Sequence, residues 1–126
     1  MKTKTFCLDT NYLVRFLTRD IESQAQIAKK IILNHKTFIP AIVFAETVYI
    51  LNNHYQVKKN KIFSTFLSLF KQPNITHPPF IPQAMNIYNQ ENISFYDSLI
   101  LAESLEKKLP LKTFDQKLQK TFSKYS

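Results

Sequence analysis

Short apolar segments alternate along this chain with longer segments in which apolar residues recur every three or four positions. Alternation of this kind is typical of an α/β fold with a mostly parallel sheet, because each helix must return the chain to the start of the next strand. Apolar runs predict strands at residues 5–8, 37–39, 74–77 and 111–114, with a last strand near Phe122. Helical spacing predicts helices over about residues 10–18, 41–53, 61–71, 82–88 and 97–108, a short helix after Asp115, and a helix capped by Asp20 that contains Ala25, Ala28 and Ile32.

Glycine is absent from all 126 residues. Turns must therefore rely on Asn, Asp and Pro, as in Asn52-Asn53 and Pro78-Pro79. Glycine-rich phosphate loops and dinucleotide-binding fingerprints are excluded, because both need glycine at fixed positions. A chain of this length is long enough for one real core, so we expect residues 1–126 to be a single domain.

No segment is typical of a membrane span or of an export signal. The longest apolar run surrounds Glu46 and falls short of the about 20 apolar residues that cross a bilayer. Asp9 and Asn11 interrupt what would be the apolar core of a signal peptide. We therefore expect a cytoplasmic protein without a membrane partner. The single Cys7 cannot form an internal disulfide and is expected to be a small core residue.

Four of the nine acidic residues lie at or inside apolar segments: Asp9, Glu46, Asp97 and Asp115. Asp9 and Asp115 follow predicted strands and Asp97 opens a predicted helix, so all three are expected to face the crevice at the carboxyl ends of the strands. Glu46 is the most unusual, because its helical neighbours Ile42, Val43, Tyr49 and Ile50 are largely apolar. A carboxylate in such a stripe must be solvated, paired, protonated or bound to metal.

The types and charges of these residues favour metal-dependent chemistry on a phosphate polymer. Mg²⁺ and Mn²⁺ prefer carboxylate oxygens, and clustered carboxylates repel each other unless a cation intervenes. A bound divalent ion activates water and stabilises charge on a phosphate under attack. The seventeen Lys and Arg residues outnumber the five remaining acids by twelve, which favours a polyanionic partner. The candidate phosphate contacts are Arg15, Arg19 and two groups of lysines, at 58, 59 and 61 and at 107, 108 and 112.

Simpler explanations exist for several of these residues. Each of the three aspartates suits a helix N-cap, where a carboxylate accepts a backbone hydrogen bond and meets the positive end of the helix dipole. The arginines and lysines are equally suited to solvated surface. His35, His54 and His77 lack the spacing of zinc ligands and are expected at the surface or in an interface.

Five stretches, in this order, resemble the motifs of PIN-domain nucleases, most closely the VapC-type toxins of bacterial toxin–antitoxin pairs. They are Phe6-Cys7-Leu8-Asp9-Thr10-Asn11, Val14 to Asp20, Ile39-Pro40 to Ala45-Glu46, Phe95-Tyr96-Asp97-Ser98-Leu99-Ile100 and Lys112-Thr113-Phe114-Asp115. The chain departs from the family at residues 106–110, where a glycine is usual, and at residues 116–118, where a further aspartate is common.

The resemblance implies a PIN-like three-layer α/β/α sandwich around a short, mostly parallel central sheet. It implies that Asp9, Glu46, Asp97 and Asp115 are catalytic and bind one or two Mg²⁺ or Mn²⁺ ions, with Asn11 and Thr113 as supporting polar groups. The implied reaction is endonucleolytic cleavage of RNA that leaves 5′-phosphate and 3′-hydroxyl ends. The implied partners are a second copy of the chain and a cognate antitoxin protein.

Two other functions fit parts of the sequence. A basic RNA-binding module on a degenerate PIN scaffold would lack catalysis, although the complete set of four acids argues against it. An Asp-based phosphotransferase or receiver domain also places Asp after strands. Receiver domains need adjacent acids near the first strand, and here Thr10-Asn11 follows Asp9.

Overall fold

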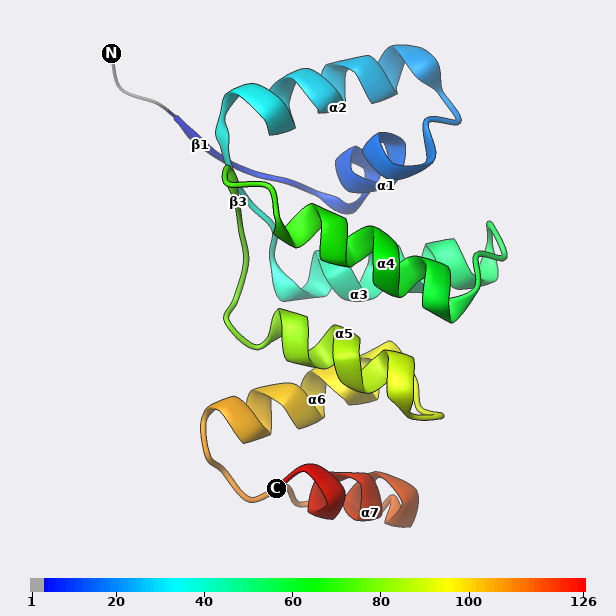
Figure 1. Ribbon diagram of the computed structural model, residues 1–126, viewed down its shortest axis with the longest axis vertical. Coiled ribbons are helices and arrows are strands. Elements are labelled where there is room, and N and C mark those ends of the chain that lie inside the picture. Colours follow the sequence, from blue (N-terminus) through cyan, green and yellow to red (C-terminus); the bar gives the residue numbers. More distant parts are fainter. Residues whose placement is uncertain (1–3) are drawn as a thin grey trace. The chain divides into compact units, whose positions relative to one another are not determined.

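The computed structural model describes residues 4–126, which separate into a first unit that ends at Pro78 and a second unit that comprises Pro79–Ser126. The first unit holds a three-stranded parallel sheet in the order β1-β2-β3 (Figure 1). The predicted α/β class and parallel sheet are therefore confirmed. The elements of this unit are β1 (Thr5–Cys7), α1 (Thr10–Thr18), α2 (Glu22–Asn34), β2 (Lys36–Phe38), α3 (Ala41–Asn53), α4 (Lys59–Phe70) and β3 (Ile75–Thr76).

Backbone hydrogen bonds continue the sheet one residue beyond its strands. The Leu8 amide donates to the Phe38 carbonyl at 3.0 Å, and the Ile39 amide donates to the Thr76 carbonyl at 2.9 Å. Because the strands are parallel, β1 and β2 end at the same edge of the sheet. This register places the start of α1 and the start of α3 at that edge, where a ligand site is expected.

The core of the first unit contains a cluster of aromatic rings. The Phe44 side chain of α3 and the Phe66 side chain of α4 are fully buried, with ring centroids 5.6 Å apart. Phe70 lies 6.0 Å from Phe44, and the ring of His77, just after β3, packs 5.0 Å from Phe70. Large aromatic side chains dominate core energetics, so this cluster holds α3, α4 and the end of β3 together.

The second unit contains α5 (Ile81–Gln90), α6 (Phe95–Glu106) and α7 (Gln116–Tyr125). Tyr88 and Phe95 pack edge to face, with centroids 5.6 Å apart, where α5 passes into α6. Glu91 binds α7, since it accepts hydrogen bonds from Lys124 Nζ and the Tyr125 hydroxyl, each at 2.8 Å. The Lys124 and Tyr125 contacts lower the pKa of Glu91. The pKa of Tyr125 is raised to about 12, first by burial and then by the contact with the Glu91 carboxylate.

Several predicted elements are wrong. Residues 111–114 form no strand, and Phe122 lies within α7. Helix α6 begins at Phe95, two residues before Asp97, because Ser94 supplies the cap. Asp20 does not cap α2, which begins at Glu22 after Ile21.

Cys7 is also not the small core residue that its apolar neighbours predicted. Its side chain is exposed on the short strand β1. In the part of the chain that the structure describes, no helix has the length and apolar character needed to cross a membrane.

The lack of glycine places ordinary residues in left-handed backbone conformations. Arg19, Gln56 and Lys108 have φ values of 56°, 55° and 57°. Lys108 follows α6 and forms the hydrogen bonds of a Schellman turn, with its amide donating to Leu105 and the Leu109 amide donating to Ser104. Glycine is the usual residue at this position, because a Cβ atom disfavours the left-handed region. Lys108 lies in the 106–110 segment, where the expected glycine is missing.

We predict that Lys108→Gly raises the free energy of unfolding by about 0.5–1 kcal/mol, since relief of the left-handed strain exceeds the entropy cost of glycine. Urea denaturation measures this difference. Lys107→Gly is the matched control: Lys107 has an ordinary φ of −85° and binds Glu103. The Lys107→Gly variant should therefore have a lower free energy of unfolding than the unsubstituted protein. A loss of stability in Lys108→Gly would contradict the argument.

Candidate functional site

Asp9 lies directly beyond the carboxyl end of β1 and is the N-cap of α1. Its Oδ1 atom accepts a hydrogen bond from the Tyr12 amide at 3.0 Å, and its side chain is exposed. The cap fixes the orientation of the carboxylate. The second oxygen, Oδ2, takes no part in the cap and is available to a ligand.

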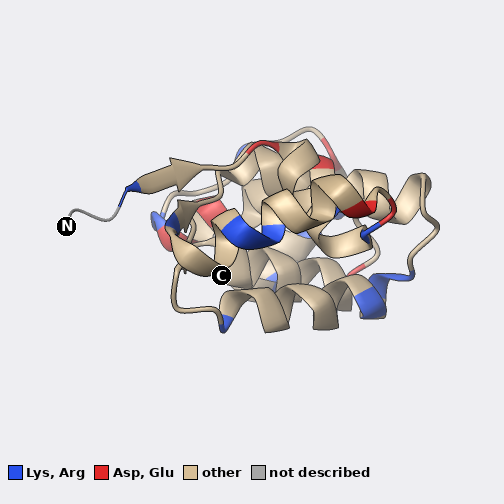
Figure 2. Cartoon of the chain, turned by 90° about the horizontal axis from the view of Figure 1, so that it is seen from above, with Lys and Arg blue, Asp and Glu red and all other residues tan. Residues whose placement is uncertain are grey.

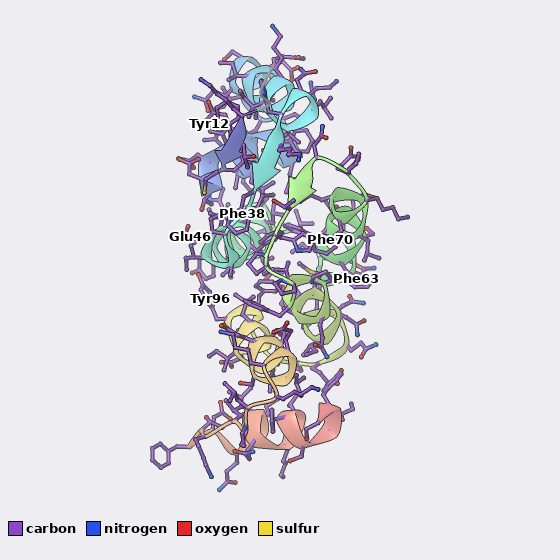
Figure 3. All side chains as sticks on the ribbon, turned by 90° about the vertical axis from the view of Figure 1, so that its left-hand side faces the viewer. Tyr12, Phe38, Glu46, Phe63, Phe70 and Tyr96 are labelled. Carbon is purple, nitrogen blue, oxygen red and sulfur yellow. The ribbon has the colours of Figure 1, made fainter. Side chains whose placement is uncertain are left out.

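Glu46 lies in the second turn of α3, on the exposed face of the helix. Figure 3 shows its side chain on the outward side of α3. Two of its apolar neighbours, Ile42 and Tyr49, are each 58% exposed, so the predicted apolar stripe is not a buried one. The Thr10 hydroxyl donates to Glu46 Oε1 at 2.5 Å. Because Thr10 follows Asp9 in the chain, this hydrogen bond links Glu46 to the residue next to Asp9.

A pocket of about 300 Å³ opens beside Asp9. Its lining comes from α1, α2 and the residue before α1, and consists of Asp9, Asn11, Tyr12, Arg15, Gln24 and Ile27. Asn11, predicted as a supporting polar group, therefore shares a cavity with Asp9.

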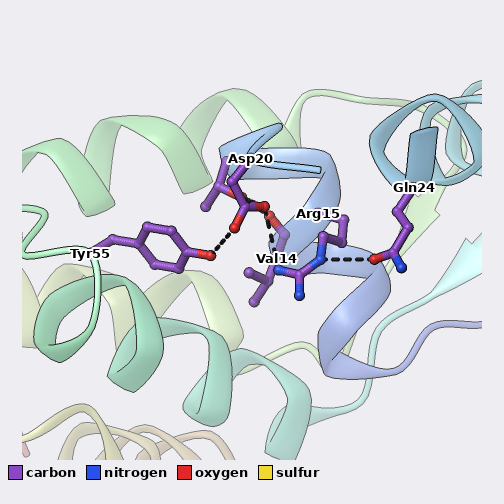
Figure 4. Close-up of polar contacts among 6 residues, drawn as sticks. Val14, Arg15, Asp20, Gln24 and Tyr55 are labelled. Carbon is purple, nitrogen blue, oxygen red and sulfur yellow. Dashed lines mark hydrogen bonds and ion pairs between the residues drawn. The ribbon is translucent and has the colours of Figure 1, made fainter. Parts of the chain in front are cut away.

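Arg15 is held at this pocket by a polar network (Figure 4). Its Nε atom donates to Gln24 Oε1 at 2.9 Å, and Nη1 lies 3.4 Å from Asp20 Oδ1. Asp20 also accepts hydrogen bonds from the Tyr55 and Thr18 hydroxyls. The pKa of Asp20 is lowered, most by the hydrogen bond from Tyr55, then by the hydrogen bond from Thr18 and the positive charge of Arg15. Asp20 therefore stays ionised and orients Arg15.

Arg19 lies outside this network. Its guanidinium binds Glu22 at 2.7 Å, on the exposed first turn of α2. Of the two arginines that the sequence suggested for phosphate binding, the structure places Arg15 at the Asp9 pocket and pairs Arg19 with a nearby acid.

The other two predicted carboxylates belong to the second unit. Asp97 lies in the first turn of α6, where its amide donates to Ser94 Oγ at 3.1 Å. Asp115 is the N-cap of α7, and its Oδ1 atom accepts from the Leu118 amide at 3.1 Å. Thr113 Oγ1 accepts a hydrogen bond from the Asp115 amide at 3.0 Å, so Thr113 shapes the turn that presents Asp115.

The structure thus divides the predicted quartet, with Asp9 and Glu46 in the first unit and Asp97 and Asp115 in the second. Within residues 4–126, no three His, Cys, Asp or Glu side chains come together in an arrangement that would hold a metal ion. The N-cap explanation holds for Asp9 and Asp115 but not for Asp97. The cap bonds use only Oδ1 in both cases, so capping and metal binding are compatible roles.

Basic residues are spread over several elements, as the ribbon coloured by charge shows (Figure 2). Lys58, Lys59 and Lys61 surround the start of α4, and Lys107 and Lys108 follow α6. Lys107 already forms an ion pair, because its Nζ atom binds Glu103 at 2.6 Å. This contact also raises the pKa of Lys107.

Sequence reasoning missed two contributors, Thr10 and Gln24. Thr10 lies in the same motif as Asp9, but only the fold shows that its hydroxyl reaches Glu46, 36 residues away. Gln24 carries no local signal in the sequence, and its role follows from the packing of α2 beside α1.

We predict that Mg²⁺ raises the melting temperature of the unsubstituted protein, and that Asp9→Asn and Asp97→Asn fold normally but lose this rise. Asn caps a helix about as well as Asp, so loss of charge is the main change at Asp9, and Asp97 is not a cap. Thermal unfolding with and without Mg²⁺ measures the effect. Glu22→Gln, an exposed change on α2, should keep the rise. If the unsubstituted protein gains nothing from Mg²⁺, the aspartates are not ligands.

Comparison with known proteins identifies the family of the chain. A search of curated proteins found no match. The PIN-domain family model matches residues 6–122, which include all four carboxylates. The mixed α/β structure with a short parallel sheet is consistent with a PIN-like fold. PIN domains are generally nucleases and typically bind divalent metal ions. The chain belongs to the PIN-domain family.

Proposed function

We propose that the protein is an endoribonuclease that depends on Mg²⁺ or Mn²⁺, with Asp9, Glu46, Asp97 and Asp115 as its catalytic carboxylates. The observation that carries the proposal is the hydrogen bond between Thr10 and Glu46. It links Glu46 to the residue that directly follows Asp9, in a chain of the PIN family.

The residues present fit a hard divalent cation. All four groups offer carboxylate oxygens, the ligands that Mg²⁺ and Mn²⁺ prefer. Asp9 and Asp115 each engage only Oδ1 in their caps. Glu46 is exposed, with Oε1 bound to Thr10. When bound, a divalent ion would neutralise the carboxylates and lower the pKa of water.

The side chains of this chain have separate roles in the proposed reaction. Asp9, Asp97 and Asp115 would hold the cation, and Asn11 and Thr113 would support their setting. Thr10 fixes the rotamer of Glu46 and leaves Oε2 to orient the attacking water or to accept its proton. Arg15, oriented by Asp20, lines the pocket beside Asp9 and would contact the RNA there.

We predict that the purified protein cuts single-stranded RNA with Mg²⁺ or Mn²⁺ and stops when EDTA is added. Gel analysis of a labelled RNA measures cleavage, and restored metal should revive it. Cleavage that persists in excess EDTA contradicts the metal mechanism.

Thr10→Val removes the donor to Glu46 and should lower kcat about tenfold or more, the scale of a misplaced acid–base group. Thr10→Ser keeps the donor and should retain activity.

We further propose that the protein is the toxin of a toxin–antitoxin pair, acting in the cytoplasm as a homodimer. Its motif order resembles VapC-type toxins, which supports this role. The apolar side chains of Ile42 and Tyr49 flank Glu46 on the exposed face of α3, as expected of a surface that a protein partner covers. An antitoxin segment that carries Arg could bridge the carboxylates with its planar guanidinium and so displace the cation.

We predict that expression of this chain alone slows bacterial growth and that Asp9→Ala abolishes the effect. A small co-encoded protein should restore growth by binding directly, which co-purification would detect. Growth curves under matched expression levels are the measurement. Normal growth despite folded, nuclease-active protein would reject the toxin role and leave the nuclease proposal intact.

A further inference from the structure

The pocket beside Asp9 has the size and lining of a site for one nucleobase. Its volume of about 300 Å³ lies at the lower end of the range for small-molecule sites. Two of its six lining residues, Tyr12 and Ile27, supply apolar surface, and Arg15, Gln24 and Asn11 supply polar groups. A flat apolar wall with hydrogen-bonding groups at one side is the pattern with which proteins hold an unstacked base.

Tyr12 supplies an aromatic surface in the same pocket as Asp9. Its side chain is 40% exposed, so one part of the ring is open to a ligand. Its amide is bound by Asp9 Oδ1, which ties the backbone of Tyr12 to the carboxylate. A base stacked on this ring would therefore belong to a nucleotide close to Asp9 and to the phosphate that a cation there would bind. Ile27, 55% exposed on α2, supplies further apolar surface in the same pocket.

Arg15 and Gln24 give the pocket a donor-rich side. The Arg15 Nε donates to Gln24 Oε1, and Nη1 faces Asp20. This leaves Arg15 Nη2 and Gln24 Nε2, both donors, with no acceptor among residues 4–126. Two neighbouring donors match a base edge that presents two neighbouring acceptors. The N7 and O6 atoms of guanine form such an edge, whereas adenine presents an acceptor and a donor there.

We propose that this pocket binds a guanine base of single-stranded RNA, in a nucleotide adjacent to the phosphate that is cut. The inference rests on the proposed nuclease function for the position of the cut, but not for the binding itself. Tyr12 stacks on the base, Arg15 and Gln24 read its N7 and O6 edge, and Asp20 holds Arg15 in place. Gln24 is thus a specificity-determining residue rather than a catalytic one.

The test is RNA binding without catalysis, measured by fluorescence anisotropy in EDTA. The probes are labelled oligouridylates that carry a single central guanosine, adenosine or cytidine. The unsubstituted protein should bind the guanosine probe about tenfold more tightly than the adenosine probe, as one good bidentate base contact provides. Gln24→Ala should abolish that difference. Gln26→Ala is the matched control, because Gln26 lies on α2, binds Glu22 and does not line the pocket.

Substitutions of Tyr12 test the stacking role. Tyr12→Ala should weaken binding of the guanosine probe about tenfold, the scale of one lost base–aromatic stack, and Tyr12→Phe should retain affinity. Circular dichroism of each variant checks that it folds. Equal affinity of the unsubstituted protein for all three probes, or no RNA binding at all, overturns the inference. So does a Gln24→Ala variant that behaves like Gln26→Ala.

Cleavage of the same probes with Mg²⁺ separates this inference from the nuclease proposal. Guanine-selective binding that depends on Gln24, without metal-dependent cleavage, would support the pocket and reject the nuclease. Metal-dependent cleavage with no effect of Gln24→Ala on base preference would support the nuclease and reject the pocket.

Discussion

The parallel register of three very short strands is the constraint on which the first unit depends. The hydrogen bonds from Leu8 to Phe38 and from Ile39 to Thr76 carry the ladder past the strands themselves. A shift of one residue would turn the buried Leu8 and Ile39 to the opposite face of the sheet. The same register sets where α1 and α3 begin. It therefore sets the approach of Thr10 to Glu46, so a sheet of few residues determines the geometry of the candidate site.

Helix capping and ligand binding are combined in the same aspartates. At Asp9 and Asp115 one carboxylate oxygen satisfies the first turn of a helix, and the positive end of that helix favours negative charge on the side chain. The cap thus holds the carboxylate in one rotamer before any ligand arrives. Such preorganisation suits a catalytic group, because a side chain that is already fixed loses little conformational entropy when a ligand binds.

The sequence predicted well those features that depend on local pattern. The helix over residues 41–53 was predicted with the bounds that the structure shows, because an uninterrupted apolar stretch follows Pro40. The start of α6 was predicted two residues late, at Asp97, although Ser94 and Asp97 have the spacing of a capping box. The predicted strand at residues 111–114 failed because an apolar pattern does not form a strand without a neighbouring strand. Phe114, at its end, is fully exposed.

Features that depend on distant residues could not be read from the sequence. The exposure of Glu46 is one, because Ile42 and Tyr49 are apolar in type yet face away from the core. The role of Asp20 is another. It precedes a helix, as a cap does, but its carboxylate binds Arg15 and the hydroxyl of Tyr55, which lies 35 residues away in the chain. The bond between Thr10 and Glu46 also spans elements whose proximity only the folded sheet creates.

The shortness of the strands has a consequence for how this chain behaves at high concentration. In the sheet order, β1 and β3 are the outer strands, of three and two residues. Long, flat outer strands offer rows of unpaired amides and carbonyls that recruit other chains and begin aggregation. Strands this brief offer few such groups, and Lys4 places a charge beside β1. A chain with eleven phenylalanines thereby limits edge-to-edge association through the smallness of its sheet.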